Sequence, residues 1–121
     1  VAGLLLLAGV AYATTLTPQG ITPAGLVLTP VPATATEFDF ENDGHQAIWF
    51  SNGSDSTLNY TVTIPGSVAG YALEDIVGTV ISHTEMYVGP FNPTYANNAR
   101  GKVDFTVDIT DSVMLAVIEL R

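Results

Sequence analysis

The sequence contains no cysteine and very few basic residues. Without cysteine the chain can form no disulfide, no thiolate metal site and no cysteine nucleophile, so packing has to stabilise it. Only 3 residues are Lys or Arg, whereas 12 are Asp or Glu, and the net charge is −9. This charge repels the phosphate backbone of nucleic acids and the surface of anionic membranes, so we expect no nucleic-acid partner.

Charged residues are scarce overall, because they make up 12% of the 121 residues against 47% hydrophobic residues. An ordinary soluble domain has about 25% charged residues. The hydrophobic content excludes a disordered chain. The length accommodates a single domain with one hydrophobic core.

Sequence motifs of catalysis and metal binding are missing as well. His45 and His83 are the only histidines, and their separation fits no zinc-ligand motif. There is no Gly-x-Ser-x-Gly nucleophile elbow and no phosphate-binding loop. We therefore predict a protein without enzymatic activity, cofactor, bound metal or small-molecule substrate.

One acidic stretch has the oxygen ligands that Ca²⁺ prefers. Its carboxylates alternate along an expected strand: Glu37, Asp39, Glu41 and Asp43. Because the loop pattern Asp-x-Asp-x-Asp-Gly is absent, we interpret these residues as a solvated acidic face rather than a calcium site.

An uncharged apolar segment stands at the N-terminus. Residues 1–13 read VAGLLLLAGVAYA. As a helix this segment would span about 20 Å, less than the roughly 30 Å hydrocarbon core of a bilayer, so we expect no stable transmembrane insertion. A segment that is apolar on every side has to be buried on every side. We expect neighbouring copies of the chain to bury it, and burial in its own core is the alternative. The predicted assembly interface consists of Leu4, Leu5, Leu6, Leu7, Val10 and Tyr12.

The conformation of this apolar segment is open between two forms. Ala and Leu favour a helix, which Gly3 and Gly9 weaken. An extended donor strand in the groove of a neighbour would also bury both of its faces. Burial of four leucine side chains stabilises either form by about 6–12 kcal/mol, which is comparable with the cost of association.

A connector rich in Thr and Pro follows the apolar segment, and it is expected to be extended because proline disfavours helix. We expect Leu26–Leu28 to dock as an edge strand, where proline is tolerated. This divides the chain into an assembly segment (1–17), a connector with a first edge strand (18–36) and a β-sandwich domain (37–121).

Hydrophobic residues alternate with polar ones from Glu37 onward, as in half-buried strands. The last strand is apolar on both faces, so we expect it either in the centre of a sheet or under a partner. Six to eight short strands separated by turn signals predict an all-β sandwich or a jelly-roll-like domain. The expected strands include 47–50, 58–64, 76–81, 85–88, 103–109 and 113–120.

Two glycosylation sequons occur, at Asn52 and Asn59. Asn52 is expected in a turn, and Asn59 on the outward face of a strand. On an extracellular protein either side chain is a candidate glycan acceptor.

Six turns and strand ends stand out between residues 20 and 121, at Ile21–Leu26, Phe40–Gly44, Phe50–Ser54, Tyr60–Thr63, Val88–Phe91 and Gly101–Val103. In this order they resemble a family of small head-associated proteins of tailed phages, some thought to decorate capsids. The resemblance implies a structural, assembly-bound β-domain without catalysis. The N-terminal segment is similar to that of pilins, in which a peptidase removes a basic leader and the apolar stretch is retained as the filament core.

Two functions fit this pattern. The leading hypothesis is a subunit of an extracellular, pilus-like filament on the cell surface, a helical polymer of many copies that self-assembles through the buried apolar segment. The alternative is a virion protein that decorates, or cements, a phage capsid. Both predict a homo-oligomeric structural protein, and they differ in the role of residues 1–13.

Overall fold

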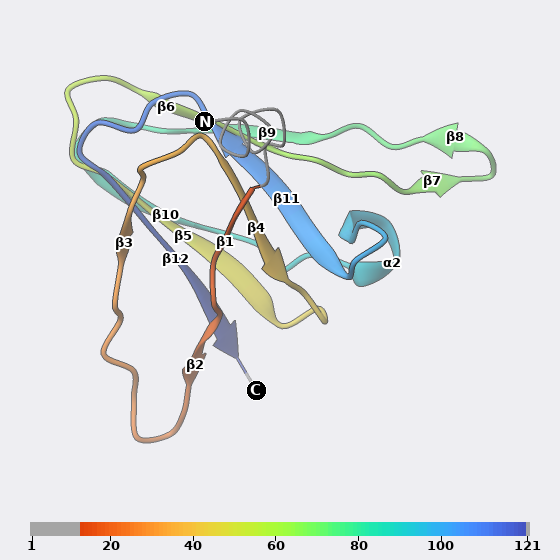
Figure 1. Cartoon of the computed structure of the whole chain (residues 1–121), viewed down its shortest axis with the longest axis horizontal. Helices are drawn as coiled ribbons and strands as arrows, with labels where there is room; N and C mark the ends of the chain where they lie inside the picture. The colour runs from red at the N-terminus through yellow and green to blue at the C-terminus, as the bar shows by residue number, and fades with distance from the viewer. Residues whose placement is uncertain (1–12, 121) are drawn as a thin grey trace, which may run out of the picture.

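The computed structural model describes residues 13–120, and these residues are almost entirely β-structure (Figure 1). The predicted assembly residues Leu4, Leu5, Leu6, Leu7, Val10 and Tyr12 lie outside the described range. The strands form two main sheets, here called sheet A and sheet B, and a small hairpin. This agrees with the predicted sandwich.

Sheet A has five strands in the order β1-β4-β11-β6-β9. All neighbours are antiparallel except β1 and β4, which run parallel. Their bounds are β1 Thr14–Thr15, β4 Glu37–Glu41, β11 Lys102–Val107, β6 Leu58–Val62 and β9 Ile76–Val80.

Sheet B has the order β10-β5-β12-β2, and β3 also pairs with β12. The strand β12 is therefore central, as its two apolar faces predict. The bounds are β10 Thr84–Val88, β5 Gln46–Asn52, β12 Val113–Leu120, β2 Gln19–Ile21 and β3 Val31–Pro32.

Two smaller elements lie beyond one end of the sandwich. The hairpin of β7 (Ser67–Val68) and β8 (Tyr71–Ala72) extends away from the sheets, and the one-turn helix α2 (Pro93–Ala96) lies near its base (Figure 1). Asn92 caps this helix, because its side-chain oxygen accepts a hydrogen bond from the Thr94 amide at 3.0 Å.

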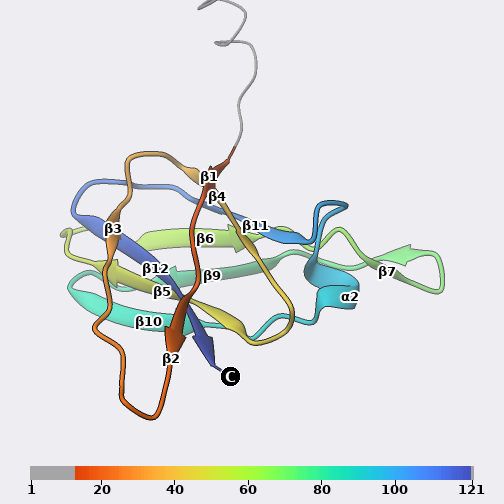
Figure 2. The same cartoon turned by 60° about the horizontal axis from the view of Figure 1, so that its bottom comes forward.

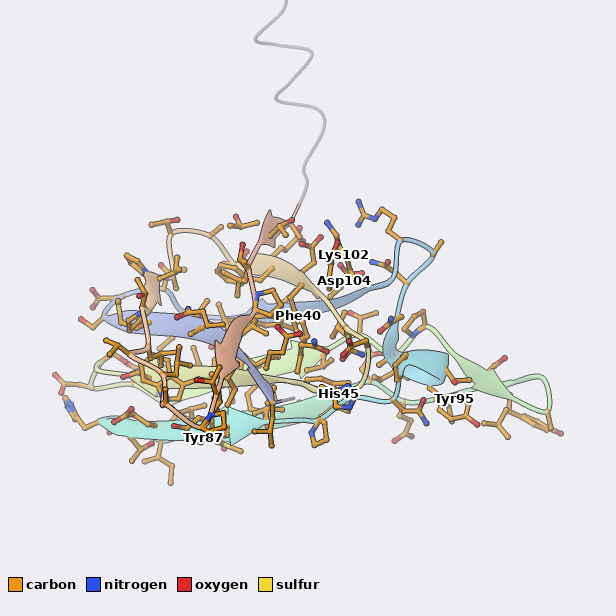
Figure 3. The ribbon with its side chains drawn as sticks, turned by 90° about the horizontal axis from the view of Figure 1, so that it is seen from below. Phe40, His45, Tyr87, Tyr95, Lys102 and Asp104 are labelled. Carbon is orange, nitrogen blue, oxygen red and sulfur yellow. The ribbon has the colours of Figure 1, made fainter. Side chains whose placement is uncertain are left out.

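Aromatic side chains from both sheets meet in the core. Phe105 of sheet A stacks on Phe38 at a centroid distance of 5.4 Å and contacts Phe50 of sheet B edge-on at 5.7 Å. Phe40 points between the layers (Figure 3). These rings are fully buried, and along β4 and β11 the buried apolar residues alternate with polar ones, as the period-two pattern predicts.

The connector runs from one sheet to the other. We call residues 13–36 the N-terminal arm. It pairs with β4 through β1, buries Leu16 in the core, and then pairs with β12 through β2 and β3 (Figure 2). The arm thereby covers one side of the sandwich.

The edge strand expected at Leu26–Leu28 is a wrong prediction. These residues form no strand, and Val27 is 92% exposed. The arm turns beyond the end of sheet B here, so no strand is available to pair with it. Pairing resumes at β3, which contacts β12 at Met114 and Leu115.

Candidate assembly interface

The arm is the part of the described structure to which residues 1–12 connect. Thr14 and Thr15 pair with Phe38 and Asp39 of β4. The Leu16 amide donates to the Asp39 carbonyl oxygen at 2.8 Å, and the Leu16 side chain is 4% exposed. The chain is therefore attached to the sandwich from Thr14 onward by main-chain pairing and by a buried side chain.

Asp39 corrects the expected solvated acidic face. Its side chain is buried, because the arm lies over it. One carboxylate oxygen accepts a hydrogen bond from the Thr15 hydroxyl at 2.6 Å, and the other lies 3.8 Å from Nη2 of Arg100. A buried carboxylate requires such partners, so Asp39 links the arm to sheet A.

The other three acidic residues are exposed. Glu37 and Glu41 stand on the outer face of β4, as expected, but Asp43 belongs to the following turn. There Asp43 lies 3.2 Å from Nδ1 of His45. Within residues 13–120, no group of three or more His, Asp or Glu side chains is placed to hold a metal ion.

The turns at one end of the sandwich are organised by the buried side chain of Asn42. Its amide nitrogen donates to the Phe91 carbonyl at 3.2 Å and to the Asn97 side-chain oxygen at 2.8 Å. Its amide oxygen accepts from the Gly44 amide at 3.1 Å, and its main-chain N–H donates to the Gly101 carbonyl at 3.2 Å. One residue thus joins the turn after β4 to residues 91–101, which lie at least 49 positions further along the chain.

An open polar hollow of about 350 Å³ lies beside these turns. Glu41, Gln46, Arg100 and Glu119 are among its lining residues. The Gln46 amide nitrogen donates to Glu119 at 3.0 Å, and its amide oxygen accepts from the Asp43 amide at 2.8 Å. Through these bonds Gln46 links the start of β5 to the end of β12 and to the turn at Asp43.

Asn52 is not on a surface turn, contrary to the sequence-based expectation. It ends β5 and is 1% exposed. Its amide nitrogen donates to the carbonyls of Ser56 and Val80, at 2.7 and 3.0 Å, while its amide oxygen accepts from Ser54. The nitrogen that a glycan would modify is therefore enclosed in the folded chain.

Asn59 does lie on the outward, exposed face of β6. Its side-chain nitrogen donates to one carboxylate oxygen of Asp108 at 2.7 Å, and its main-chain N–H donates to the other at 2.8 Å. Desolvation acts to raise the pKa of Asp108, but the hydrogen bonds from Asn59, and those from the Asp108 and Ile109 amides, outweigh it and lower the pKa below its ordinary value.

The side of the sandwich opposite the arm is formed by β9 and β10, the edge strands of the two sheets. Val77, Ile81 and Tyr87 are exposed there, and Figure 3 shows Tyr87 at the outer surface of β10. This surface was not predicted from the sequence. The sequence signal for this surface is the uncharged run Ile76–Ser82. As a strand, this run has apolar side chains on both of its faces.

The two histidines lie at the surface, whereas Tyr60 lies in the core. Both histidines are exposed, and Nε2 of His83 lies 2.8 Å from a carboxylate oxygen of Asp55. Burial raises the pKa of Tyr60, whose ring stacks on Phe50 at 5.0 Å in the core.

Among the described residues there is no helix with the length and hydropathy needed to cross a membrane.

Comparison of the chain with protein-family models, with curated proteins and with solved structures finds no match.

Proposed function

We propose that this chain is a non-catalytic structural subunit that acts in many copies on the outside of a larger particle, as a decoration protein of a phage capsid. The observation that carries the proposal is the convergence around Asn42. Three of the motifs that resemble phage head-associated proteins, at residues 40–44, 88–91 and 101–103, meet at this side chain or beside it.

A fourth resembling motif, at residues 50–54, organises the opposite end of the sandwich in the same way. Asn52 binds the carbonyls of Ser56 and Val80, while Ser54 binds back to Asn52. Four of the six resembling motifs therefore take part in holding the turns at the two ends. Buried, fully bonded polar networks of this kind make a domain rigid, which suits a displayed structural module.

The charge distribution supports a position outside a DNA-filled shell. The net charge of −9 opposes contact with packaged nucleic acid. Sheet A presents Glu37 and Glu41 on its outer face, and Asp108 follows β11 at the end of that sheet. An acidic outer surface also keeps neighbouring particles apart.

A filament subunit remains the second candidate, and the uncharged sequence of residues 1–13 favours it. In this function the apolar segment is buried among neighbouring subunits and the sandwich forms the outer surface. The phage proposal takes precedence because motifs of its resemblance bind one another through buried side chains at both ends of the sandwich.

Immunogold electron microscopy of native particles, with an antibody raised against this chain, tests the proposal. We expect gold over the outer surface of capsid shells. Labelling along threads would overturn the capsid function in favour of the filament.

Deletion of residues 1–13 provides the second arm of the test. We expect the truncated chain to rebind capsids from which the protein has been stripped, because the sandwich provides the binding surface. A filament subunit would instead lose polymerisation on this deletion, and also in the full-length Leu5→Asp variant, since a charge in a dry interface costs several kcal/mol.

A further inference from the structure

We propose that β9 is a self-recognition edge, at which two copies of this chain pair antiparallel about Gly78 and join their A sheets. The proposal is independent of the capsid function, because it follows from the described sandwich alone. Its evidence is the direction of the main-chain groups of β9, the absence of charge along the strand, and a contrast with the other sheet edges.

The main-chain directions in β9 follow from hydrogen bonds on the far side of β6. The Asn59 carbonyl accepts from the Asp108 amide at 3.1 Å, and the Thr63 amide donates to the Asp104 carbonyl at 2.9 Å. The main-chain N–H and C=O groups of the odd-numbered residues in β6 therefore point toward β11. Those of the even-numbered residues point toward β9.

The partners of the even-numbered residues in β6 are Ile76, Gly78 and Val80. Their main-chain groups are thus directed to β6, which leaves those of Val77 and Thr79 directed outward. Since β9 is the last strand of sheet A, no other strand in the described part of the chain pairs with these groups. A second β9 strand, in antiparallel orientation, presents the same groups in return.

A twofold axis at Gly78 places Val77 of one copy opposite Thr79 of the other. Each of these two pairs exchanges two hydrogen bonds, so four main-chain bonds form across the axis. On the inner face, Ile76 comes opposite Val80 of the second copy and loses part of its exposure. Exposed Val77 on the outer face gains a cross-strand neighbour.

Charge selects the antiparallel orientation. Two chains of charge −9 repel each other, yet residues 76–82 carry no charge, so close approach is unfavourable only at the flanks. Parallel pairing would place Glu74 and Asp75 against the same residues of the second copy. In antiparallel pairing, the carboxylates of one copy lie about six residues, or about 20 Å, from the same carboxylates of the other copy. This distance exceeds the screening length of about 8 Å at physiological ionic strength.

The other edges of the two sheets are protected from such pairing. The edge strands β1, β2 and β3 have two or three residues each, and prolines stand beside or within β2 and β3. The β10 edge carries Glu85, whose carboxylate accepts from the Trp49 indole at 3.1 Å. Short strands, proline and charge are the usual means of blocking an edge, and β9 has none of them along its length.

Single-cysteine variants test both the contact and its register, because the natural chain has no cysteine. Full-length Val77→Cys and Thr79→Cys are mixed and oxidised mildly with diamide. The proposed pairing puts these two positions directly opposite, so we expect the mixed 77–79 disulfide to exceed either same-residue disulfide by at least tenfold. Both positions are exposed, so each variant is expected to fold.

Tyr87→Cys on the β10 edge is the matched control, because Tyr87 is 63% exposed and Val77 is 71% exposed. Same-residue disulfides in excess would indicate parallel pairing or antiparallel pairing about a residue other than Gly78, and either result would overturn the proposal. Cross-linking no greater than that of the control would also overturn it.

Sedimentation of the full-length chain gives an independent measurement. Val77→Lys is expected to weaken the association through this edge at least tenfold, whereas Tyr87→Lys is expected to change it less than twofold. Equal association of both variants and of the unmodified chain would contradict the proposal.

Discussion

The two long sides of the sandwich are closed in different ways. On one side the N-terminal arm pairs with both sheets and buries Leu16 between them. On the other side β9 and β10 are simply the last strands, and apolar side chains there face outward. The chain thus protects one side internally, and the open side is the one that is available to a second copy.

The comparison also locates stability and recognition on different sides. A change in the arm removes contacts with a core that includes both sheets, so it should destabilise the whole domain. A change on the exposed face of β9 should alter association and leave the fold intact. The following predictions test this division, beginning with the largest expected effect.

Leu16→Ala is expected to lower the free energy of unfolding by about 2–5 kcal/mol, because it leaves a cavity between the sheets. Denaturant unfolding measures the change. Ile81→Ala, at a side chain that is 65% exposed on the open side, is the control and should change stability by no more than about 0.5 kcal/mol. Equal effects would show that the arm does not close the sandwich.

Thr15→Val should destabilise the domain by about 1.5–3 kcal/mol, because it removes the hydroxyl that donates to the buried Asp39 carboxylate. The same substitution at the neighbouring Thr14, which is exposed, is the control. Chemical denaturation of both variants, compared at neutral pH, gives the difference. A neutral Thr15→Val variant would mean that Asp39 does not depend on the arm.

Gly78→Ala introduces a methyl group against the Tyr60 hydroxyl, since a Cβ at residue 78 would overlap the end of that ring. We expect a loss of about 1–3 kcal/mol from overpacking, measured as a lower thermal midpoint. Gly20→Ala, in the opposite edge strand, meets no atom within 4 Å and should be nearly neutral. A neutral Gly78→Ala variant would show that the open edge is loosely packed.

The bonds between Asp108 and Asn59 belong to the middle strands of sheet A, away from both sides of the sandwich. Its pKa is lowered in the folded chain, so its contribution to stability is complete above the unfolded value of 3.8 and is lost as the pH falls through the lower folded value. Asp108→Asn should therefore reduce the fall in denaturation midpoint between about pH 5 and about pH 2. The exposed Asp111→Asn variant is the control, and an equal acid sensitivity in both variants would contradict this assignment.

The core strands could be predicted from the sequence because their pattern is local. Phe38 and Phe40 alternate with acidic residues, and Val103, Phe105 and Val107 alternate in the same manner. Such alternation identifies the buried face without knowledge of the partner strand. The two apolar faces of β12 likewise predict its central position.

The surroundings of individual polar residues could not be predicted in this way. Asn52 and Asp39 look like surface residues in the sequence, yet each is buried by a segment that lies elsewhere in the chain. Val80 is 28 residues from Asn52, and Thr15 is 24 residues from Asp39. Burial of a polar side chain depends on these distant partners, which no local pattern encodes.

The sequence by itself determined an acidic, cysteine-free, all-β chain with a period-two core and an uncharged N-terminal segment. Only the tertiary structure decided which side of the sandwich the arm covers and which sheet edges remain open. The physical reason is that side-chain alternation is set residue by residue, whereas strand order and edge exposure depend on hydrogen bonds between segments far apart in the chain.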